Sequence, residues 1–143
     1  MLFVKKKRRI ERLLVVEDEP LVAFDTEHIL TDAGFTIVGT VDRVADAIAV
    51  IDGGKTIDMV LLDVDLADGS GISVARAAHA AGVAVLFVTG NCPGEAVALA
   101  QGCLSKPYGQ RDLIAAINAI EAAMDGKALR RLPPGLKLFT AAR

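Results

Sequence analysis

The sequence predicts an α/β fold in which five βα units form a doubly wound, five-stranded parallel sheet with helices on both faces. Short apolar runs alternate along the chain with segments of helical periodicity, and glycine or proline marks most boundaries. The run Met59–Leu62 is apolar throughout, which is typical of a strand buried on both faces of a sheet. Alternating strands and helices favour a parallel sheet with right-handed crossovers.

In the first half of the chain, the residues at the boundaries support each expected element. Pro20 suits the first turn of a helix, and Gly34 suits the position after its end. Strand one stops at three acidic residues, and a pair of glycines ends helix two. We therefore expect strands at residues 12–16, 36–41 and 58–63, and helices at residues 20–33 and 43–52.

The second half continues the alternation but includes an irregular stretch. Gly90, Pro93 and Gly94 disfavour a regular helix start, so the segment 95–101 has room for two helical turns at most. The fourth helix is therefore expected to be short or irregular. We expect a third helix ending near residue 81, a strand at 83–88, a short strand at 103–105 and a last helix at 110–125.

Length and charge predict one domain at residues 12–125 between two basic ends. The chain has 143 residues and a net charge of −2, but residues 13–126 carry five basic and seventeen acidic residues. The ends are expected to be a basic leader at 1–11 and a basic, flexible tail at 126–143. No apolar run is long enough to span a bilayer, and no export signal is evident. Two cysteines outside any metal motif are then reduced thiols, which favours a cytoplasmic protein.

Chemically capable residues end four of the five expected strands. Strand one ends in Glu17 and Asp18, strand three in Asp63 and strand four in Thr89, and Lys106 follows strand five. Alone, each is commonly a cap or loop residue. Together they should meet, because ligands of open α/β sheets bind at the carboxyl ends of the strands.

Crowded carboxylates predict a cation site, for which Mg²⁺ is the natural occupant and Mn²⁺ a possible substitute. Asp18 and Asp63 could ligate directly, Glu17 through a water, and Asp65 through its backbone carbonyl. Asp63 could then attack phosphorus to give an aspartyl phosphate, with Lys106 neutralising the charge that develops. The hydroxyl of Thr89 and the backbone groups near Asp65 and Gly90 would contact the phosphoryl oxygens.

These motifs resemble the receiver domain of two-component response regulators over residues 12–125. The acidic pair falls on Glu17-Asp18, the phosphoacceptor on Asp63, the hydroxyl on Thr89 and the Lys-Pro pair on Lys106-Pro107. The resemblance implies a flavodoxin-like fold and phosphotransfer from a sensor histidine kinase or a histidine phosphotransferase. It also implies a downstream signalling partner and no enzymatic activity beyond Mg²⁺-dependent self-phosphorylation and slow self-dephosphorylation.

The sequence departs from the family pattern around the fourth helix. Cys103 stands where the family has an aromatic switch residue, and the stretch from Thr89 to Lys106 is short. Phe87-Val88-Thr89-Gly90 resembles the FATGUY group of single-domain receivers. We therefore expect a single-domain protein that signals by contact or phosphate relay, with a switch that orders residues 90–102.

Two alternatives stay open on the sequence alone. Asp63-Val64-Asp65 resembles the D-x-D motif of haloacid-dehalogenase-type phosphatases, in which the second aspartate is a general acid/base. The basic ends could bind nucleic acid, although neither a helix-turn-helix nor interleaved aromatic residues are evident, so that role is not expected.

Overall fold

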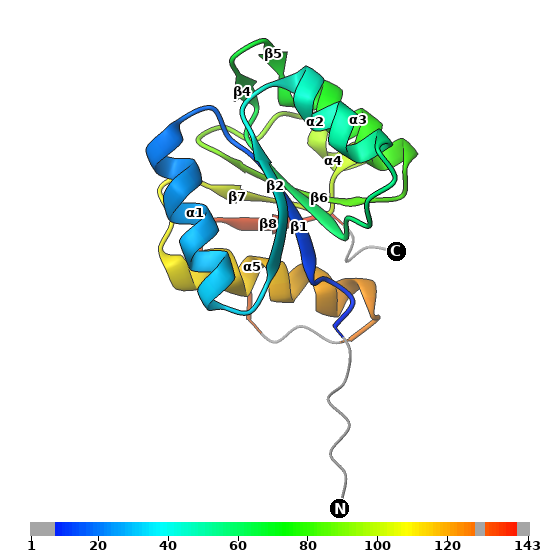
Figure 1. The fold of residues 1–143 in the computed structure, drawn as a ribbon. Helices are drawn as coiled ribbons and strands as arrows, with labels where there is room; N and C mark the ends of the chain where they lie inside the picture. Colours follow the sequence, from blue (N-terminus) through cyan, green and yellow to red (C-terminus); the bar gives the residue numbers. More distant parts are fainter. Residues whose placement is uncertain (1–7, 128–130, 140–143) are drawn as a thin grey trace, which may run out of the picture.

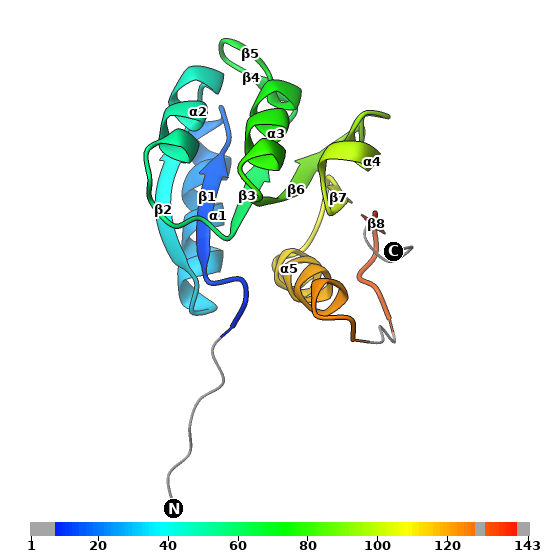
Figure 2. The same cartoon turned by 90° about the vertical axis from the view of Figure 1, so that its right-hand side faces the viewer.

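The computed structural model describes residues 8–127 and 131–139 of the chain. Its central sheet has the strand order β2-β1-β3-β6-β7-β8, and Figures 1 and 2 show helices on both sides of it. The first five strands in this order pair in parallel, as the sequence predicts. The α/β doubly wound fold is therefore confirmed.

The parallel strands and their connecting helices have clear bounds. The strands are β1 Arg12–Val16, β2 Thr36–Val41, β3 Met59–Leu62, β6 Ala84–Thr89 and β7 Gly102–Ser105. The helices are α1 Pro20–Asp32, α2 Val44–Asp52, α3 Gly71–Ala80, α4 Ala96–Leu99 and α5 Gln110–Met124. None of these helices is long and apolar enough to cross a membrane, in the part of the chain that the structure describes.

The sheet separates two apolar clusters. On one face, α1 and α5 bury residues such as Leu30 and Ile117 against β1, β3 and β6. On the other, α2, α3 and α4 contribute residues such as Ile51, Val74 and Ala96. Figure 1 shows the two groups of helices on opposite sides of the strands. Every residue of β3 is buried, which places this strand at the centre of both clusters.

The fourth helix is a single turn, Ala96–Leu99, and the expectation of a short fourth helix is confirmed. The segment is nevertheless anchored to the body. Ala96 and Ala100 are buried, and the backbone N–H of Gln101 donates to the carbonyl of Val85 at 2.9 Å. The amide oxygen of Gln101 accepts from the N–H of Val85 at 2.6 Å.

The tail contributes a sixth strand, β8 Leu136–Leu138, which pairs antiparallel with β7. The expectation of a five-stranded, wholly parallel sheet is therefore incomplete, and that of a loose tail is wrong for these residues. The physical reason is the open edge of β7, whose backbone groups need partners. The remainder of the predicted flexible tail includes residues 128–130 and 140–143, which lie outside the described residues.

A two-stranded hairpin, β4 Asp65–Leu66 with β5 Gly69–Ser70, occupies the segment expected to be a loop after β3. Gly69 makes its turn at a positive φ of 154°. The hairpin is fixed to α2 because the carboxylate of Asp68 accepts from the backbone N–H of Val44 and, at 3.2 Å, from that of Ala45. These two bonds cap the N-terminus of α2 and lower the pKa of Asp68.

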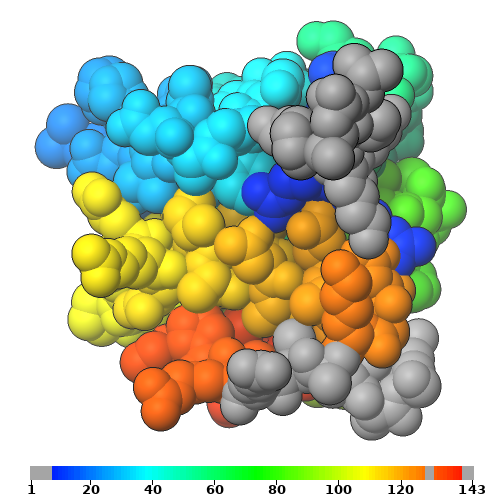
Figure 3. Space-filling model, turned by 90° about the horizontal axis from the view of Figure 1, so that it is seen from below, coloured from blue at the N-terminus to red at the C-terminus, as the bar shows by residue number. Residues whose placement is uncertain are grey.

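The described end of the N-terminal leader packs against α5. The guanidinium of Arg8 lies over the ring of Phe35, 4.5 Å from its centroid, and pairs with Glu121. Arg9 donates to the carbonyl of Met124 at the end of α5. Figure 3 shows α5 between α1 and the segment that contains β8. Residues 1–7 of the predicted leader lie outside the described residues.

Candidate functional site

Three carboxylates meet at the carboxyl ends of β1 and β3. Glu17 and Asp18 follow β1, Asp63 follows β3, and ligand atoms of the three all lie within 4.8 Å of one another. Backbone hydrogen bonds hold both chain segments in place. The N–H of Glu17 donates to Val41 at 2.9 Å, and the N–H of Asp63 donates to Val16 at 3.1 Å.

Lys106 joins this cluster from the end of β7. Its Nζ lies 3.3 Å from Oε1 of Glu17 and 3.3 Å from Oδ2 of Asp63. The Lys106 N–H also donates to the carbonyl of Thr89 at 2.9 Å, and the Lys106–Pro107 peptide bond is cis. The structure thus brings together four residues that the sequence assigned to one site, namely Glu17, Asp18, Asp63 and Lys106.

Burial and charge set the protonation of the cluster. Burial raises the pKa of Glu17 to about 7. The hydrogen bond from the Glu19 N–H and the positive charge of Lys106 lower this pKa, but by less than burial raises it. Burial would lower the pKa of Lys106, but the attraction of Glu17 and Asp63 exceeds that effect and raises it. The raised pKa of Glu17 therefore reflects its burial, whereas the raised pKa of Lys106 reflects its two carboxylate neighbours.

The backbone after Asp63 is positioned by close packing on Gly71. The N–H of Gly71 donates to Val64 at 2.6 Å, and a Cβ at Gly71 would lie 2.1 Å from the carbonyl oxygen of Asp63. Only glycine permits that approach, because any other residue would push the loop away from α3. Gly71 therefore fixes the course of the chain that leaves the acidic cluster.

Thr89 is buried at the end of β6, where its carbonyl accepts a hydrogen bond from the N–H of Lys106. Its hydroxyl accepts from the N–H of Asn91 at 3.3 Å and donates to the carbonyl of Asn91 at 3.4 Å. The side chain thus forms a local turn in this structure, and its predicted contact with a phosphoryl group stays a prediction. Gly90, which follows, is exposed and has open space around its Cα.

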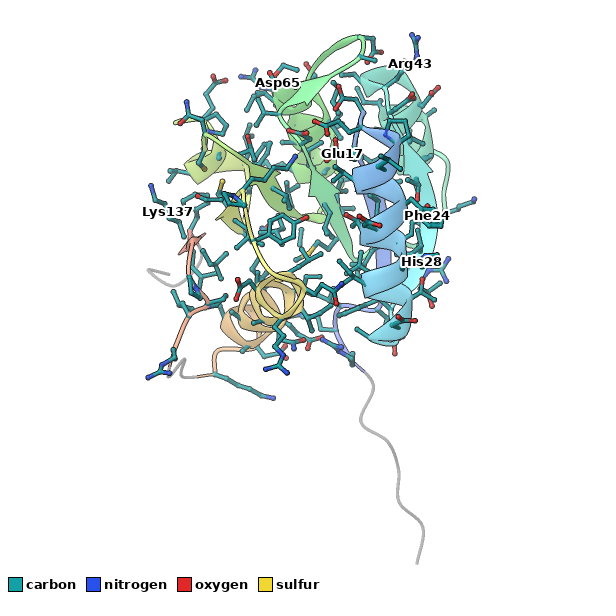
Figure 4. The ribbon with its side chains drawn as sticks, turned by 90° about the vertical axis from the view of Figure 1, so that its left-hand side faces the viewer. Glu17, Phe24, His28, Arg43, Asp65 and Lys137 are labelled. Carbon is teal, nitrogen blue, oxygen red and sulfur yellow. The ribbon has the colours of Figure 1, made fainter. Side chains whose placement is uncertain are left out.

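Asp65 lies on the hairpin, and its side chain is exposed rather than part of the acidic cluster. Figure 4 shows Asp65 and Glu17 on the same edge of the sheet. A haloacid-dehalogenase-type phosphatase would need the Asp65 carboxylate beside Asp63, so this arrangement does not favour that alternative. The predicted role of the Asp65 carbonyl as a metal ligand stays a prediction.

Tyr108 and Thr26 were not among the residues that sequence reasoning selected. They line a cavity of about 20 Å³ beneath Glu17 and Asp63, together with residues of β1, β3 and β6. Burial raises the pKa of Tyr108, and a hydrogen bond with Thr26 acts in the opposite direction. The position of Tyr108 directly after the Lys-Pro pair was the one available signal in the sequence.

The acidic cluster fits a divalent cation. Three carboxylates share a site with one lysine, so a cation of two charges would balance them. Oxygen is the ligand atom that Mg²⁺ prefers, and the partial exposure of Asp18 and Asp63 leaves room for the waters that Mg²⁺ retains. Burial raises the pKa of Glu17, and a bound cation would oppose that rise by favouring the charged carboxylate.

Comparison with known proteins identifies the family. The family described as "Response regulator receiver domain" matches residues 13–118. The chain belongs to this family. Receiver domains are typically signalling proteins rather than catalysts, and the family implies interaction with histidine kinases or phosphotransfer proteins.

Relatives and solved structures agree with the receiver family. The "Phyllosphere-induced regulator PhyR" of Methylorubrum extorquens is 34% identical over 58 residues, which are 41% of this chain and 22% of that protein's length. A response regulator receiver protein from Sinorhizobium medicae has a TM-score of 0.69 and 27% identity, covering 80% of this chain and 96% of its own. A CheY-like receiver domain from Methanospirillum hungatei, at 23% identity, shares the fold with a TM-score of 0.73, covering 82% of this chain and 98% of its own.

Proposed function

We propose that the protein is a cytoplasmic, single-domain response regulator of the FATGUY type that is phosphorylated on Asp63. The phosphoryl group would come from a sensor histidine kinase or a histidine phosphotransferase. Output would be contact with a downstream signalling protein or relay of the phosphoryl group. The observation that carries the proposal is the position of Asp63, held 3.3 Å from Lys106 and beside Glu17 and Asp18.

The chemistry assigns each residue a task. A carboxylate oxygen of Asp63 forms a bond to phosphorus, the bond between phosphorus and the donor histidine nitrogen breaks, and that nitrogen keeps the electron pair. Lys106 approaches the transferring group and offsets its negative charge. Glu17, Asp18, Asp63 and the Asp65 carbonyl would hold Mg²⁺ or Mn²⁺, which would supply further positive charge there. The Thr89 hydroxyl and backbone N–H groups near Gly90 would contact the product.

The outer side of α1 offers a contact surface for the phosphodonor protein. Leu21 is 80% exposed and Phe24 is 54% exposed, and both follow closely on the acidic pair. Figure 4 shows Phe24 and His28 on α1, and their ring centroids lie 4.4 Å apart with the ring planes tilted by 36°. Exposed large apolar side chains near a reaction site are typical of protein contacts. We infer that the donor covers this side of α1 while its histidine reaches Asp63.

The first prediction tests the phosphoacceptor. Asp63→Ala removes the only oxygen nucleophile that this mechanism uses, so labelling by a histidine kinase and radiolabelled ATP should be lost. Asp52→Ala, which changes an exposed aspartate at the end of α2, is the matched control and should label as the wild type does. Undiminished labelling of a folded Asp63→Ala protein would refute the proposal.

A further inference from the structure

The two cysteines of the chain, Cys92 and Cys103, meet on one face of the sheet. Both belong to the apolar cluster to which α2, α3 and α4 contribute. Cys103 lies in β7 and is 1% exposed, whereas Cys92 lies between β6 and α4 and is half-buried. A hydrogen bond joins their thiol groups. The fold therefore pairs two thiols that stand on either side of α4 in the sequence.

The register of the strands fixes the side of the sheet on which Cys103 lies. It pairs with Phe87 of β6 and stands opposite Lys137 of β8. Phe87 is buried in the same cluster as Cys103. Directly opposite residues of an antiparallel pair share a face of the sheet, so the positive charge of Lys137 acts on the Cys103 thiol. Cys103 is thus held in place between two neighbouring strands.

Cys92, by contrast, lies on a segment that can adjust. The residues around it, between β6 and α4, belong to neither a helix nor a strand. Gly90 and Gly94 flank it, and a Cβ at either position would meet no atom within 4 Å. The contact of the Cys92 thiol with the carbonyl of Pro93 is long, at 3.9 Å. A small displacement of this segment can therefore bring the Cys92 sulfur to bonding distance of the fixed Cys103 sulfur.

Burial and charge give the two thiols different reactivities. Burial raises the pKa of the Cys103 thiol, the hydrogen bond and charge of Cys92 raise it further, and Lys137 lowers it. A buried thiol of raised pKa reacts slowly with oxidants in solution, so oxidation begins at the more exposed Cys92. Conversion of Cys92 to a neutral sulfenic acid removes its charge and leaves that of Lys137, which favours the Cys103 thiolate. Cys103 is then placed to react with the oxidised Cys92.

We propose that Cys92 and Cys103 form a reversible disulfide when the protein meets hydrogen peroxide, and that this bond fixes the segment around α4 to β7. The Cys92 sulfur attacks a peroxide oxygen, the O–O bond breaks, and the leaving oxygen keeps the electron pair and departs as water. The Cys103 sulfur then attacks the Cys92 sulfur, the S–O bond breaks, and a second water leaves with the Cys103 proton. Together the two thiols lose two hydrogen atoms, and hydrogen peroxide is reduced to two waters.

The bond closes a loop over residues 92–103, which contains α4. Figure 2 shows α4 beside β6 and β7. In the response regulator proposed above, this loop lies in the segment after Thr89 that phosphorylation would rearrange, so the oxidised protein would hold that segment still. This consequence rests on the proposed function, whereas the formation of the bond does not. Disulfides of cytoplasmic proteins are typically transient and redox-sensing, which agrees with a reversible bond here.

Peptide mapping of the full chain tests the bond. The reduced protein is treated with hydrogen peroxide, unfolded in the presence of N-ethylmaleimide and cut after Glu95, which stands between the two cysteines. We expect the oxidised monomer to take up no maleimide and to give two cysteine-containing peptides that are joined by a disulfide. Dithiothreitol before the maleimide should separate the peptides and restore labelling of both thiols.

Two variants separate the roles of the thiols. Cys103→Ala leaves Cys92 without a partner, so its sulfenic acid should persist and be trapped by dimedone. The wild type should trap at least about tenfold less, because the neighbouring Cys103 acts at a high effective concentration. Cys92→Ala leaves the buried thiol alone, which should neither form a bond nor react with dimedone. Mass spectrometry of the intact chains measures all three.

Hydrogen exchange tests whether the bond fixes α4. The N–H groups of Ala98 and Ala100 donate to the carbonyls of Glu95 and Ala96. They should exchange more slowly in the oxidised wild type than in the reduced wild type. Neither a phosphodonor nor a phosphoryl mimic is present, so a failure of the proposed function would leave this result and the peptide map unchanged.

Three results would overturn the proposal. One is a dimer linked through Cys92 in place of the bond within one chain. Another is a wild type that accumulates sulfenic or sulfinic acid at Cys92 while Cys103 still takes up maleimide. The third is equal exchange of the α4 amides in the two redox states, which would show that the bond does not fix this segment.

Discussion

Glu17 controls how pH acts on the candidate site at the scale of single residues. Burial raises its pKa from 4.5 to about 7 in the folded protein, where its carboxylate lies beside Asp18 and Asp63 and pairs with Lys106. A group whose pKa is higher in the folded state contributes stability at low pH. That contribution is complete below about 4.5 and is lost as pH rises through about 7.

Glu17→Gln should therefore remove a pH-dependent loss of stability. Without divalent cations, the free energy of unfolding of the wild type should fall relative to the variant between pH 4.5 and 8. The relative fall should be at most about 3.5 kcal/mol, because the pKa rises from 4.5 to about 7 and each pKa unit corresponds to about 1.4 kcal/mol. Urea unfolding in the presence of a chelator measures both proteins. Parallel curves for the two would show that Glu17 ionises as freely in the fold as in the unfolded chain.

The choice of Asp63 shows what residue patterns can predict. Asp63 follows a wholly apolar strand, and acidic residues, a threonine and a lysine stand at the ends of three other strands. This pattern located the acidic cluster and Lys106 from the sequence alone. The pattern could not give the orientation of short side chains. The Thr89 hydroxyl satisfies the backbone of Asn91, and Asp65 is exposed, because local hydrogen bonds and solvation determine those positions.

At the scale of elements, Gly71 links α3 to the acidic cluster. Gly71→Ala would place a Cβ 2.1 Å from the carbonyl oxygen of Asp63, so α3 or the loop after β3 must move. We expect a loss of about 1–3 kcal/mol in the free energy of unfolding and slower phosphorylation of Asp63. The matched control is Gly94→Ala, because its Cβ would meet no atom within 4 Å. Denaturant unfolding measures the stability of both variants, and kinase labelling measures their rates of phosphorylation. If Gly71→Ala and Gly94→Ala have the same stability and labelling rate, Gly71 does not position the loop after β3.

The segment after Thr89 supports a prediction about switching. Its helix is one turn, yet Ala96 and Ala100 are buried and Gln101 is bonded to Val85. We expect amides of residues 90–95, which precede these anchors, to exchange quickly and to gain protection when beryllofluoride binds with Mg²⁺, because Thr89 turns toward the mimic. Hydrogen exchange by mass spectrometry measures this change. Strong protection before the mimic is added would instead place the output on a preformed surface.

Elements with their own sequence pattern were predictable, and elements that depend on a distant partner were not. The five parallel strands and five helices follow from apolar runs and from glycine or proline at their ends. β8 has only three residues and follows Pro133-Pro134-Gly135, which favours a turn. It is a strand because the edge of β7 provides hydrogen bonds, a condition that the local sequence does not contain.

At the scale of the whole molecule, the basic N-terminal end serves the fold. Arg8 pairs with Glu121 at 3.2 Å and Arg9 with Asp125 at 3.0 Å, so two of the positive charges compensate acids of α5. Arg9 also donates to the carbonyl of Met124, where a cation stabilises a helix C-terminus. These contacts support a structural role for the described part of the leader over the nucleic-acid role considered from charge alone.

Arg8 offers the sharpest test of that structural role. Its side chain is 33% exposed. The guanidinium lies over the Phe35 ring, pairs with Glu121 and donates to Asn118, so it ties the leader both to the turn after α1 and to α5. Arg8→Ala should lower the free energy of unfolding by about 1–2 kcal/mol, the sum expected for a stacked cation and a partly exposed ion pair.

Two further variants separate the contributions at Arg8. Arg8→Lys keeps the charge but loses the planar stacking surface, so its loss should be intermediate. Lys55→Ala removes an exposed charge near the end of α2 and should change stability by less than about 0.5 kcal/mol. In about 1 M salt, the loss of unfolding free energy caused by Arg8→Ala should become smaller, because salt screens the ion pair with Glu121. The portion of the loss that comes from stacking on Phe35 should remain, because salt does not screen ring contacts. If Arg8→Ala matches Lys55→Ala at low salt, the leader contributes nothing to folding, and its charge must serve a partner instead.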